Sequence, residues 1–143
     1  MLPTRTPKLF LLGTPRIELG GQVIHLARQK SIALLTYLVL TGRTHLREWL
    51  ATLLWPEVRS SRTQLRKSLA DIRHQLGDAC LTTTWDEVGI QEGTLWSDVG
   101  TLLSVSVNFH KQETTSLLDV NYMLNLYPQH LLNGFTLRDA PNF

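Results

Sequence analysis

Four arginines between residues 59 and 73 lie three, four and seven positions apart: Arg59, Arg62, Arg66 and Arg73. On an α-helix these spacings place the side chains on one flank. An arginine side chain presents a planar fork of N–H donors, which suits phosphate groups and the edges of guanine bases. The segment therefore predicts a helix that binds an anion, with a nucleic acid as the first candidate partner.

An amphipathic helix over residues 61–76, with Gly77 as its C-cap, would carry most of these arginines. Its apolar side chains recur at helical spacing and form one narrow stripe: Leu65, Leu69, Ile72 and Leu76. Ser61 and Gln64 match the Ser-x-x-Gln pattern of a capping box, which predicts the helix start. Arg59 joins the cationic flank only if the helix begins early.

The outer face of this helix continues the polar side through Lys67, Thr63, Ala70 and His74, whereas its one acid, Asp71, lies on the other flank. Long cationic side chains with small residues between them fit the DNA major groove, which admits a helix. The alternative is an amphipathic helix with an ordinary solvated face. We predict as DNA contacts Arg59, Arg62, Thr63, Gln64, Arg66, Lys67, Arg73, His74 and, from a later strand, Thr83.

The charges of the chain are divided between two segments. Residues 28–77 hold nine Lys or Arg and three Asp or Glu, a net charge of +6. Residues 78–143 hold two Lys or Arg and eight acids, a net charge of −6. This asymmetry predicts a basic binding segment beside an acidic one.

The composition is that of a globular protein, since 43% of the 143 residues are hydrophobic and 18% are charged. A single cysteine, Cys80, excludes a disulfide framework and a multi-thiolate metal fold. The longest mostly apolar stretch, Ile32–Leu40, is far shorter than the about 20 residues of a membrane span. We therefore expect a cytoplasmic protein with no membrane partner. With DNA as its predicted partner, it would be associated with the nucleoid.

The start of the chain predicts a small antiparallel sheet. Residues 8–12 read as one strand and residues 16–19 as a second, which alternates apolar and polar side chains. Gly20-Gly21 is a two-residue hairpin signal, because both glycines tolerate positive φ. Residues 23–26 follow as the returning strand.

Two helices are predicted between this sheet and the cationic helix. The first covers residues 29–41 with Gly42 as its C-cap, since its apolar residues recur at helical spacing. The second covers residues 45–54 and is stopped by Pro56, with Thr44 as the best available N-cap.

Residues 80–91 read as a second hairpin that turns at Asp86-Glu87. Its outgoing strand carries the hydroxyl run Thr82–Thr84, which could donate hydrogen bonds to phosphate oxygens. The alternative is that threonine stands there for steric reasons, because β-branched residues favour strands.

Helical patterns return from Asp98, which is predicted to cap a helix over residues 99–109. A second helix is predicted over residues 116–127. Residues 139–141 (Asp-Ala-Pro) resemble the start of a further helix, and the sequence ends two residues later. This predicts that the chain is a piece of a longer protein.

Three blocks resemble the amino-terminal region of the Streptomyces antibiotic regulatory protein (SARP) family: "FLLGTPRIELGGQVIHLARQKSIALLTYLVLTGR", "LATLLWP" and "TQLRKSLADIRHQLGD". The later "LNLYPQHLLNGFTLRDAPNF" is similar to the opening of the bacterial transcriptional activator domain that follows in that family. The resemblance covers residues 8–98 and 120–143, and its blocks are specific only together.

The resemblance implies an α+β fold: a winged helix-turn-helix of OmpR/PhoB type with an N-terminal antiparallel sheet, three helices and a C-terminal hairpin wing. This DNA-binding domain would span residues 1–97. Residues 98–143 would be the truncated start of the helical activator domain, a short all-α segment. Two departures are that Leu46 stands where members often carry a serine cap, and that residues 104–116 match the usual helical linker poorly.

The resemblance further implies a transcriptional activator that binds double-stranded promoter DNA, commonly at direct repeats, and recruits RNA polymerase. By position, the polar face of its recognition helix would be Arg62, Gln64, Arg66, Lys67 and Arg73. The loop 57–60 would touch the polymerase, and the wing, residues 82–89, would lie in or beside the minor groove.

Two other classes of function remain open alternatives. An enzyme is disfavoured, since the five histidines show no metal-ligand spacing and no phosphate-binding glycine loop appears, so we expect no catalytic residue, no metal and no cofactor. A helical protein-interaction or oligomerisation fragment is the second alternative. It would use the apolar side chains of the acidic segment to form a homodimer: Leu117, Leu118, Leu124 and Tyr127.

Overall fold

The computed structural model describes residues 6–101 together with Phe135, Leu137 and Ala140. Residues 98–101 form a helical turn at the predicted position. The rest of that predicted helix lies outside the described residues. The same is true of the helix predicted over residues 116–127 and of most of the helix start at residues 139–141.

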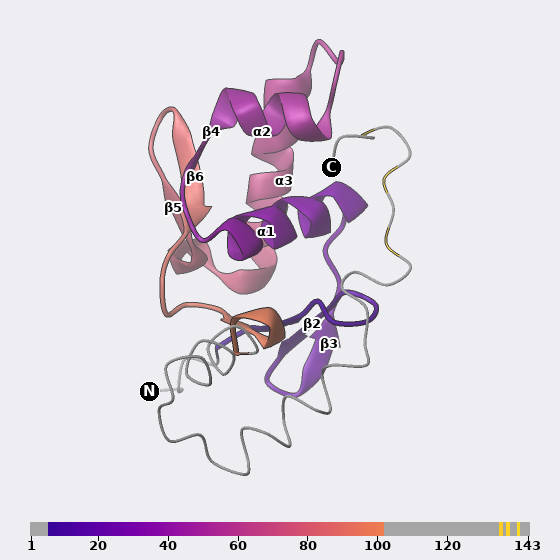
Figure 1. Cartoon of the computed structure of the whole chain (residues 1–143), viewed down its shortest axis with the longest axis vertical. Helices are drawn as coiled ribbons and strands as arrows, with labels where there is room; N and C mark the ends of the chain where they lie inside the picture. The colour runs from indigo at the N-terminus through magenta and orange to yellow at the C-terminus, as the bar shows by residue number, and fades with distance from the viewer. Residues whose placement is uncertain (1–5, 102–134, 136, 138–139, 141–143) are drawn as a thin grey trace, which may run out of the picture.

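A four-stranded sheet forms one end of the fold, with the order β3-β2-β1-β7 (Figure 1). Its strands are β1 (Lys8–Phe10), β2 (Arg16–Leu19), β3 (Gln22–Ile24) and β7 (Trp96–Ser97). The predicted first hairpin is confirmed, because Gly20 and Gly21 both have positive φ, at 62° and 82°. The prediction missed β7, which pairs parallel to β1 and places Lys8 opposite Trp96.

Three helices follow the predicted order: α1 (Gln29–Thr41), α2 (Arg47–Leu54) and α3 (Ser61–Leu76). The bounds of α1 and α3 match the prediction. Gly42 has φ of 64° and its N–H donates to the carbonyl oxygen of Leu38, which confirms the predicted C-cap. A 3-10 helix, η1 (Asp78–Cys80), leads from α3 into the second sheet.

Two predicted helix caps are wrong. Helix α2 begins at Arg47 rather than at His45, so its N-cap is Leu46 and not Thr44. Leu46 offers no side-chain acceptor, and the preceding residues are committed to a strand. The predicted capping box at the start of α3 is also not formed, because the N-cap is Ser60 and it makes no side-chain cap hydrogen bond.

The second sheet has the order β4-β6-β5 and lies at the left of Figure 1. Its strands are β4 (His45–Leu46), β5 (Leu81–Thr83) and β6 (Glu87–Ile90). The hairpin β5–β6 is the predicted wing, and β4 pairs with its second strand. A Cβ added at Gly89 would lie 2.8 Å from Cγ2 of Thr44, so this close approach of β6 requires glycine.

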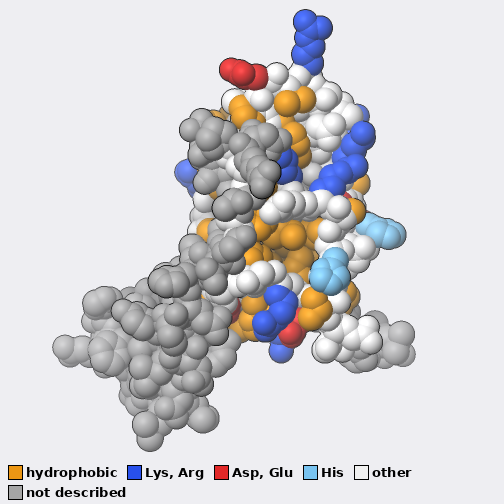
Figure 2. Space-filling model, turned by 90° about the vertical axis from the view of Figure 1, so that its right-hand side faces the viewer, with side chains coloured by type: hydrophobic (Ala, Val, Ile, Leu, Met, Phe, Trp, Pro, Cys, Tyr) orange, Lys and Arg blue, Asp and Glu red, His pale blue; other side chains and the backbone are white. Residues whose placement is uncertain are grey.

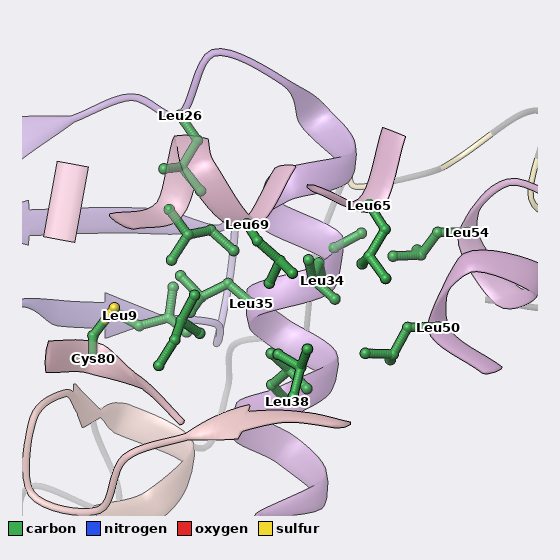
Figure 3. Close-up of a cluster of buried hydrophobic side chains, with 14 of the residues drawn as sticks. Leu9, Leu26, Leu34, Leu35, Leu38, Leu50, Leu54, Leu65, Leu69 and Cys80 are labelled. Carbon is green, nitrogen blue, oxygen red and sulfur yellow. The ribbon is translucent and has the colours of Figure 1, made fainter. Parts of the chain in front are cut away.

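Leucines from several elements meet in one core between the two sheets (Figure 3). Helix α1 contributes Leu34, Leu35 and Leu38, each with no exposed surface. Helices α2 and α3 add Leu50, Leu54, Leu65, Leu69 and Ile72, each at most 1% exposed. Phe135 and Leu137 pack against the same core. The result is the mixed α+β architecture that was predicted.

Asp98 joins the first sheet to the helical turn at residues 98–101. Its carboxylate is 1% exposed and accepts hydrogen bonds from the backbone N–H groups of Leu11, Leu12 and Val99, at 3.0, 3.1 and 2.8 Å. A carboxylate that accepts several backbone N–H groups is well compensated for its burial. Asp98 therefore fastens the end of the first strand to the segment that follows the wing.

Candidate nucleic-acid interface

Helix α3 presents a cationic outer face to solvent. Arg62, Thr63, Arg66, Lys67 and His74 are all exposed. The opposite stripe of the helix is buried against α1 and α2. The predicted helical wheel is confirmed for these residues, because the apolar stripe faces the core and the cations do not.

Arg59 does not lie on α3. The helix begins at Ser61, so Arg59 is an exposed residue of the loop that connects α2 to α3. The condition for its place on the cationic flank, an early helix start, is therefore not met. The same loop contains Glu57, which has a φ of 61°, an uncommon value for a residue other than glycine.

The one acid of α3 is turned away from this cationic face. The carboxylate oxygens of Asp71 accept hydrogen bonds from the backbone N–H groups of Ala27 and Arg28, at 3.1 and 3.3 Å. These N–H groups stand at the start of α1, where a carboxylate satisfies otherwise unpaired donors. Asp71 therefore positions α3 against α1 and does not neutralise the outer face.

Arg73 connects α3 to the wing. Its guanidinium donates a hydrogen bond to the hydroxyl oxygen of Thr83 in β5, at 2.9 Å. Arg73, Thr83 and Gln64 are half-buried, unlike the five exposed residues of the outer face. The structure thus brings two predicted contacts, Arg73 and Thr83, together, and it uses them to hold the wing.

Arg47 was missed by the sequence prediction and holds the wing from the other side. Its Nε and one terminal nitrogen donate to the carbonyl oxygen of Thr84, at 3.1 and 3.0 Å. Its backbone N–H donates to the carbonyl oxygen of Asp86 at 2.7 Å. Arg47 therefore fixes the wing turn to the start of α2.

The wing turn is held by local hydrogen bonds and carries an exposed indole. The hydroxyl of Thr84 donates to Oδ1 of Asp86 at 2.9 Å and accepts from the backbone N–H of Glu87 at 3.0 Å. Between Thr84 and Asp86, the side chain of Trp85 is 89% exposed. The predicted hairpin put the turn at Asp86-Glu87, and the sequence signal that was overlooked is the Thr-Trp-Asp run between two strands.

A groove runs between α3 and the wing turn. It is lined by Leu46, Arg47, Glu48, Arg62, Leu65, Arg66, Trp85 and Asp86. Glu48 lies 3.8 Å from the guanidinium of Arg62, with both side chains largely exposed, so this ion pair is weak. The groove therefore combines guanidinium groups, two carboxylates and apolar side chains next to the cationic face.

Two buried titratable groups, His45 and Cys80, lie off the outer face of α3. Burial lowers the pKa of His45, and the charge of Arg43 lowers it further. Burial raises the pKa of the Cys80 thiol. Within residues 6–101 and the three described C-terminal residues, no group of His, Cys, Asp or Glu side chains is arranged to hold a metal ion. No helix in the same part of the chain has the length and apolarity to cross a membrane.

Neither a protein-family model nor a curated protein sequence matches this chain. Its structure is similar to that of Mycobacterium tuberculosis EmbR, solved in complex with a low-affinity phosphopeptide, with a TM-score of 0.66 and 19% sequence identity. The match covers 90% of this chain, which spans 38% of the length of the EmbR chain. The protein therefore shares the winged-helix fold of the matched part of EmbR.

Proposed function

We propose that this protein is a sequence-specific DNA-binding transcriptional activator that inserts α3 into the major groove and holds its wing beside the minor groove. The observation that carries the proposal is the exposed cationic face of α3. Arg62, Arg66 and Lys67 lie within two helical turns of one another, with no acid of α3 on the same face. This spacing suits phosphates on either side of a groove and base edges within it.

The remaining parts of the proposal follow from the resemblance to SARP regulators. The protein would bind direct repeats in promoter DNA, as a homodimer or as two adjacent copies, and would contact RNA polymerase through the exposed loop 57–60. It would act in the cytoplasm, on the nucleoid, and would catalyse no reaction. The first piece of this proposal to test is DNA binding itself.

A salt titration tests DNA binding without knowledge of the operator. Fluorescence anisotropy would measure the Kd of a mixed-sequence duplex at several salt concentrations. We expect log K to fall with log salt at a slope of about −0.9 for each phosphate that the protein neutralises. Lys67→Ala should weaken binding and make the slope less steep by about one such unit, because it removes one phosphate contact.

Lys8→Ala is the matched control. Lys8 is an exposed lysine of β1, so its loss changes the net charge by the same amount at a site away from α3. If Lys8→Ala and Lys67→Ala weakened binding equally, the protein would be responding to net charge and the role of α3 would be wrong. Selection of bound sequences from a random DNA pool then measures the specificity and the spacing of the repeats.

A protein-interaction role is the second candidate, favoured by an apolar groove between the β2–β3 hairpin and α1. Its lining includes Ile17, Val23, Ile24, Leu26 and Ile32, and Val23 is 50% exposed. Figure 2 shows hydrophobic side chains at the centre of the face that is turned away from the wing. The apolar residues on which the sequence first suggested this role, between 117 and 127, lie outside the described residues.

The two candidates predict different results for DNA binding by the wild-type protein and by the variant Val23→Asp. If self-association through this groove is the main function, Val23→Asp abolishes the dimer in light scattering and the wild-type protein does not bind DNA. If DNA binding is the function, Val23→Asp leaves the Kd of a single site unchanged, because no residue of α3 lines this groove.

A further inference from the structure

The Trp85 side chain is mostly exposed, and it lies in a turn that is held by hydrogen bonds on both sides. The turn is framed by the hydrogen bonds of Thr84 with Asp86 and Glu87, and Arg47 fixes the same turn to α2. A large aromatic side chain in solvent costs free energy that burial against a partner recovers. The exposure of this indole in a hydrogen-bonded turn therefore indicates a contact surface.

The partner of Trp85 must fit the groove that it lines. Leu46, which is 53% exposed, lies in the same groove, and Leu65 contributes to its lining from α3. Arg62 and Arg66 border it on the α3 side. The groove thus offers apolar contacts beside guanidinium donors, and it is continuous with the cationic face of α3.

In duplex DNA, one sugar–phosphate strand separates a major groove from the neighbouring minor groove. With α3 in the major groove and the wing at the minor groove, this strand must pass between them. We propose that the groove between α3 and the wing turn seats that strand, and that Trp85 and Leu46 pack against its deoxyribose rings while Arg62 and Arg66 contact its phosphates. This inference rests on the proposed function of DNA binding.

The charges of the groove explain why an apolar contact is needed there. Glu48 and Asp86 line the groove with the three arginines, so the net attraction for a phosphate is small. Two nitrogens of the Arg47 guanidinium already donate to the carbonyl oxygen of Thr84, which leaves fewer donors for a phosphate. A deoxyribose ring presents C–H groups, and contact with an indole removes apolar surface from water on both sides. Such a contact adds affinity and contains no base-specific information.

The test compares Trp85→Ala with wild type on two duplexes, a mixed sequence and a sequence selected from a random pool. We expect Trp85→Ala to raise both Kd values about tenfold, the factor that corresponds to 1.4 kcal/mol. The slope of log K against log salt should be unchanged, because a deoxyribose contact releases no counterion. Trp85→Phe should recover most of the affinity, since it restores an apolar ring.

Trp49→Ala is the matched control, because Trp49 is 52% exposed on α2 and does not line the groove. It should leave both Kd values unchanged. The midpoints of thermal unfolding report whether both variants fold. Because the Trp85 side chain is mostly exposed, Trp85→Ala should lower this midpoint only slightly.

Three results would overturn the inference in distinguishable ways. If wild type binds neither duplex, the proposed function fails and the inference fails with it. If wild type binds but Trp85→Ala binds equally well, DNA binding stands and the sugar contact is wrong. If Trp85→Ala changes the bend of the duplex, measured by energy transfer between labels at its ends, Trp85 is a wedge between base pairs instead.

Discussion

The guanidinium of Arg73 donates a hydrogen bond to the hydroxyl of Thr83 at 2.9 Å, and this contact joins α3 directly to the first strand of the wing. Both residues were predicted as DNA contacts. In the structure they are half-buried, and they hold each other. This bond within the protein therefore helps to set the orientation of the wing relative to α3, without any contact from DNA.

Thr83→Val tests this bond, because valine keeps the β-branched shape and removes the acceptor. We expect a loss of about 1 kcal/mol in the free energy of unfolding, the usual value of one hydrogen bond. DNA affinity should fall several-fold, since the wing is no longer fixed. Thr94→Val is the control: its hydroxyl donates to the carbonyl oxygen of Gln91, outside the wing, so affinity should not change. Equal Kd values for Thr83→Val and wild type would contradict the role of the bond.

Glu48→Gln is expected to strengthen DNA binding. Glu48 is 3.8 Å from Arg62 and lies in the groove beside α3, where its charge opposes a phosphate. Removal of that charge should lower Kd several-fold at low salt, with a smaller gain at high salt because exposed charges are screened. Anisotropy at two salt concentrations measures both. Glu18→Gln, on β2, removes one negative charge at a distance and should change Kd less.

Leu69→Ala should destabilise the protein by about 2–5 kcal/mol, because it leaves a cavity where α3 meets the core. Leu69 is 1% exposed and belongs to the cluster in Figure 3. Urea denaturation followed by circular dichroism measures the change. Arg66→Ala, three residues before Leu69 on the exposed face of α3, is the counterpart. It should leave the stability close to that of wild type, and a large loss there would refute the assignment of faces.

Asp98→Asn tests the fastening of the first sheet to the segment after the wing. Asparagine has one acceptor oxygen, so it cannot accept from Leu11, Leu12 and Val99 together. Because hydrogen bonds to a charged group contribute about 1.5–3 kcal/mol, we expect a loss in that range. Asp78→Asn, at an exposed acid, is the control and should lose little. An unchanged midpoint of unfolding for Asp98→Asn would show that these bonds add nothing.

The free energy of unfolding should also decrease as the pH is lowered, because of His45. Burial lowers the pKa of this histidine below its ordinary value of 6.5, and the ring accepts or donates at 2.7 Å to the hydroxyl of Thr41. The unfolded chain therefore binds a proton more readily than the folded protein. The contribution of His45 is fully present above pH 6.5 and is lost as the pH falls from 6.5 through the lower folded pKa.

The measurement is the difference between wild type and His45→Gln in the free energy of unfolding, from pH 7.5 to pH 5. We expect the advantage of wild type to shrink as the pH falls, since glutamine does not titrate. A constant difference over this range would show that His45 keeps its ordinary pKa in the folded protein.

Local patterns in the sequence were enough to place α1, α3 and both hairpins. The bounds of α3 follow from a leucine stripe at helical spacing and a glycine after its last turn, and the first hairpin follows from Gly20-Gly21. These signals come from residues that are neighbours in the chain. They need no knowledge of distant segments, and for this reason they survive in the folded structure.

The missed elements depend on contacts between distant residues. Strand β7 is two residues long and exists because Trp96 pairs opposite Lys8, and β4 exists because His45 pairs opposite Val88. No periodicity can show in two residues. Because His45 pairs with the wing, α2 begins at Arg47 instead of His45, and the predicted N-cap at Thr44 is wrong.

Only part of the candidate site could be predicted, because some of its contacts also join residues that are distant in the chain. The outer face of α3 was found from spacing alone, as the exposure of Arg66 and Lys67 confirms. Arg47 was assigned to a helix without a role, because its partner, Thr84, lies 37 residues later in the chain. The exposure of Trp85 could not be predicted from the sequence, because it depends on the hydrogen-bonded turn formed by Thr84, Asp86 and Glu87.

The parallel pairing of β1 with β7 brings the two ends of the described core side by side. A unit whose entry and exit points adjoin can be spliced into a loop of another protein without stretching its host. The chain from β1 to β7 therefore enters and leaves this part of the fold at neighbouring strands of one sheet.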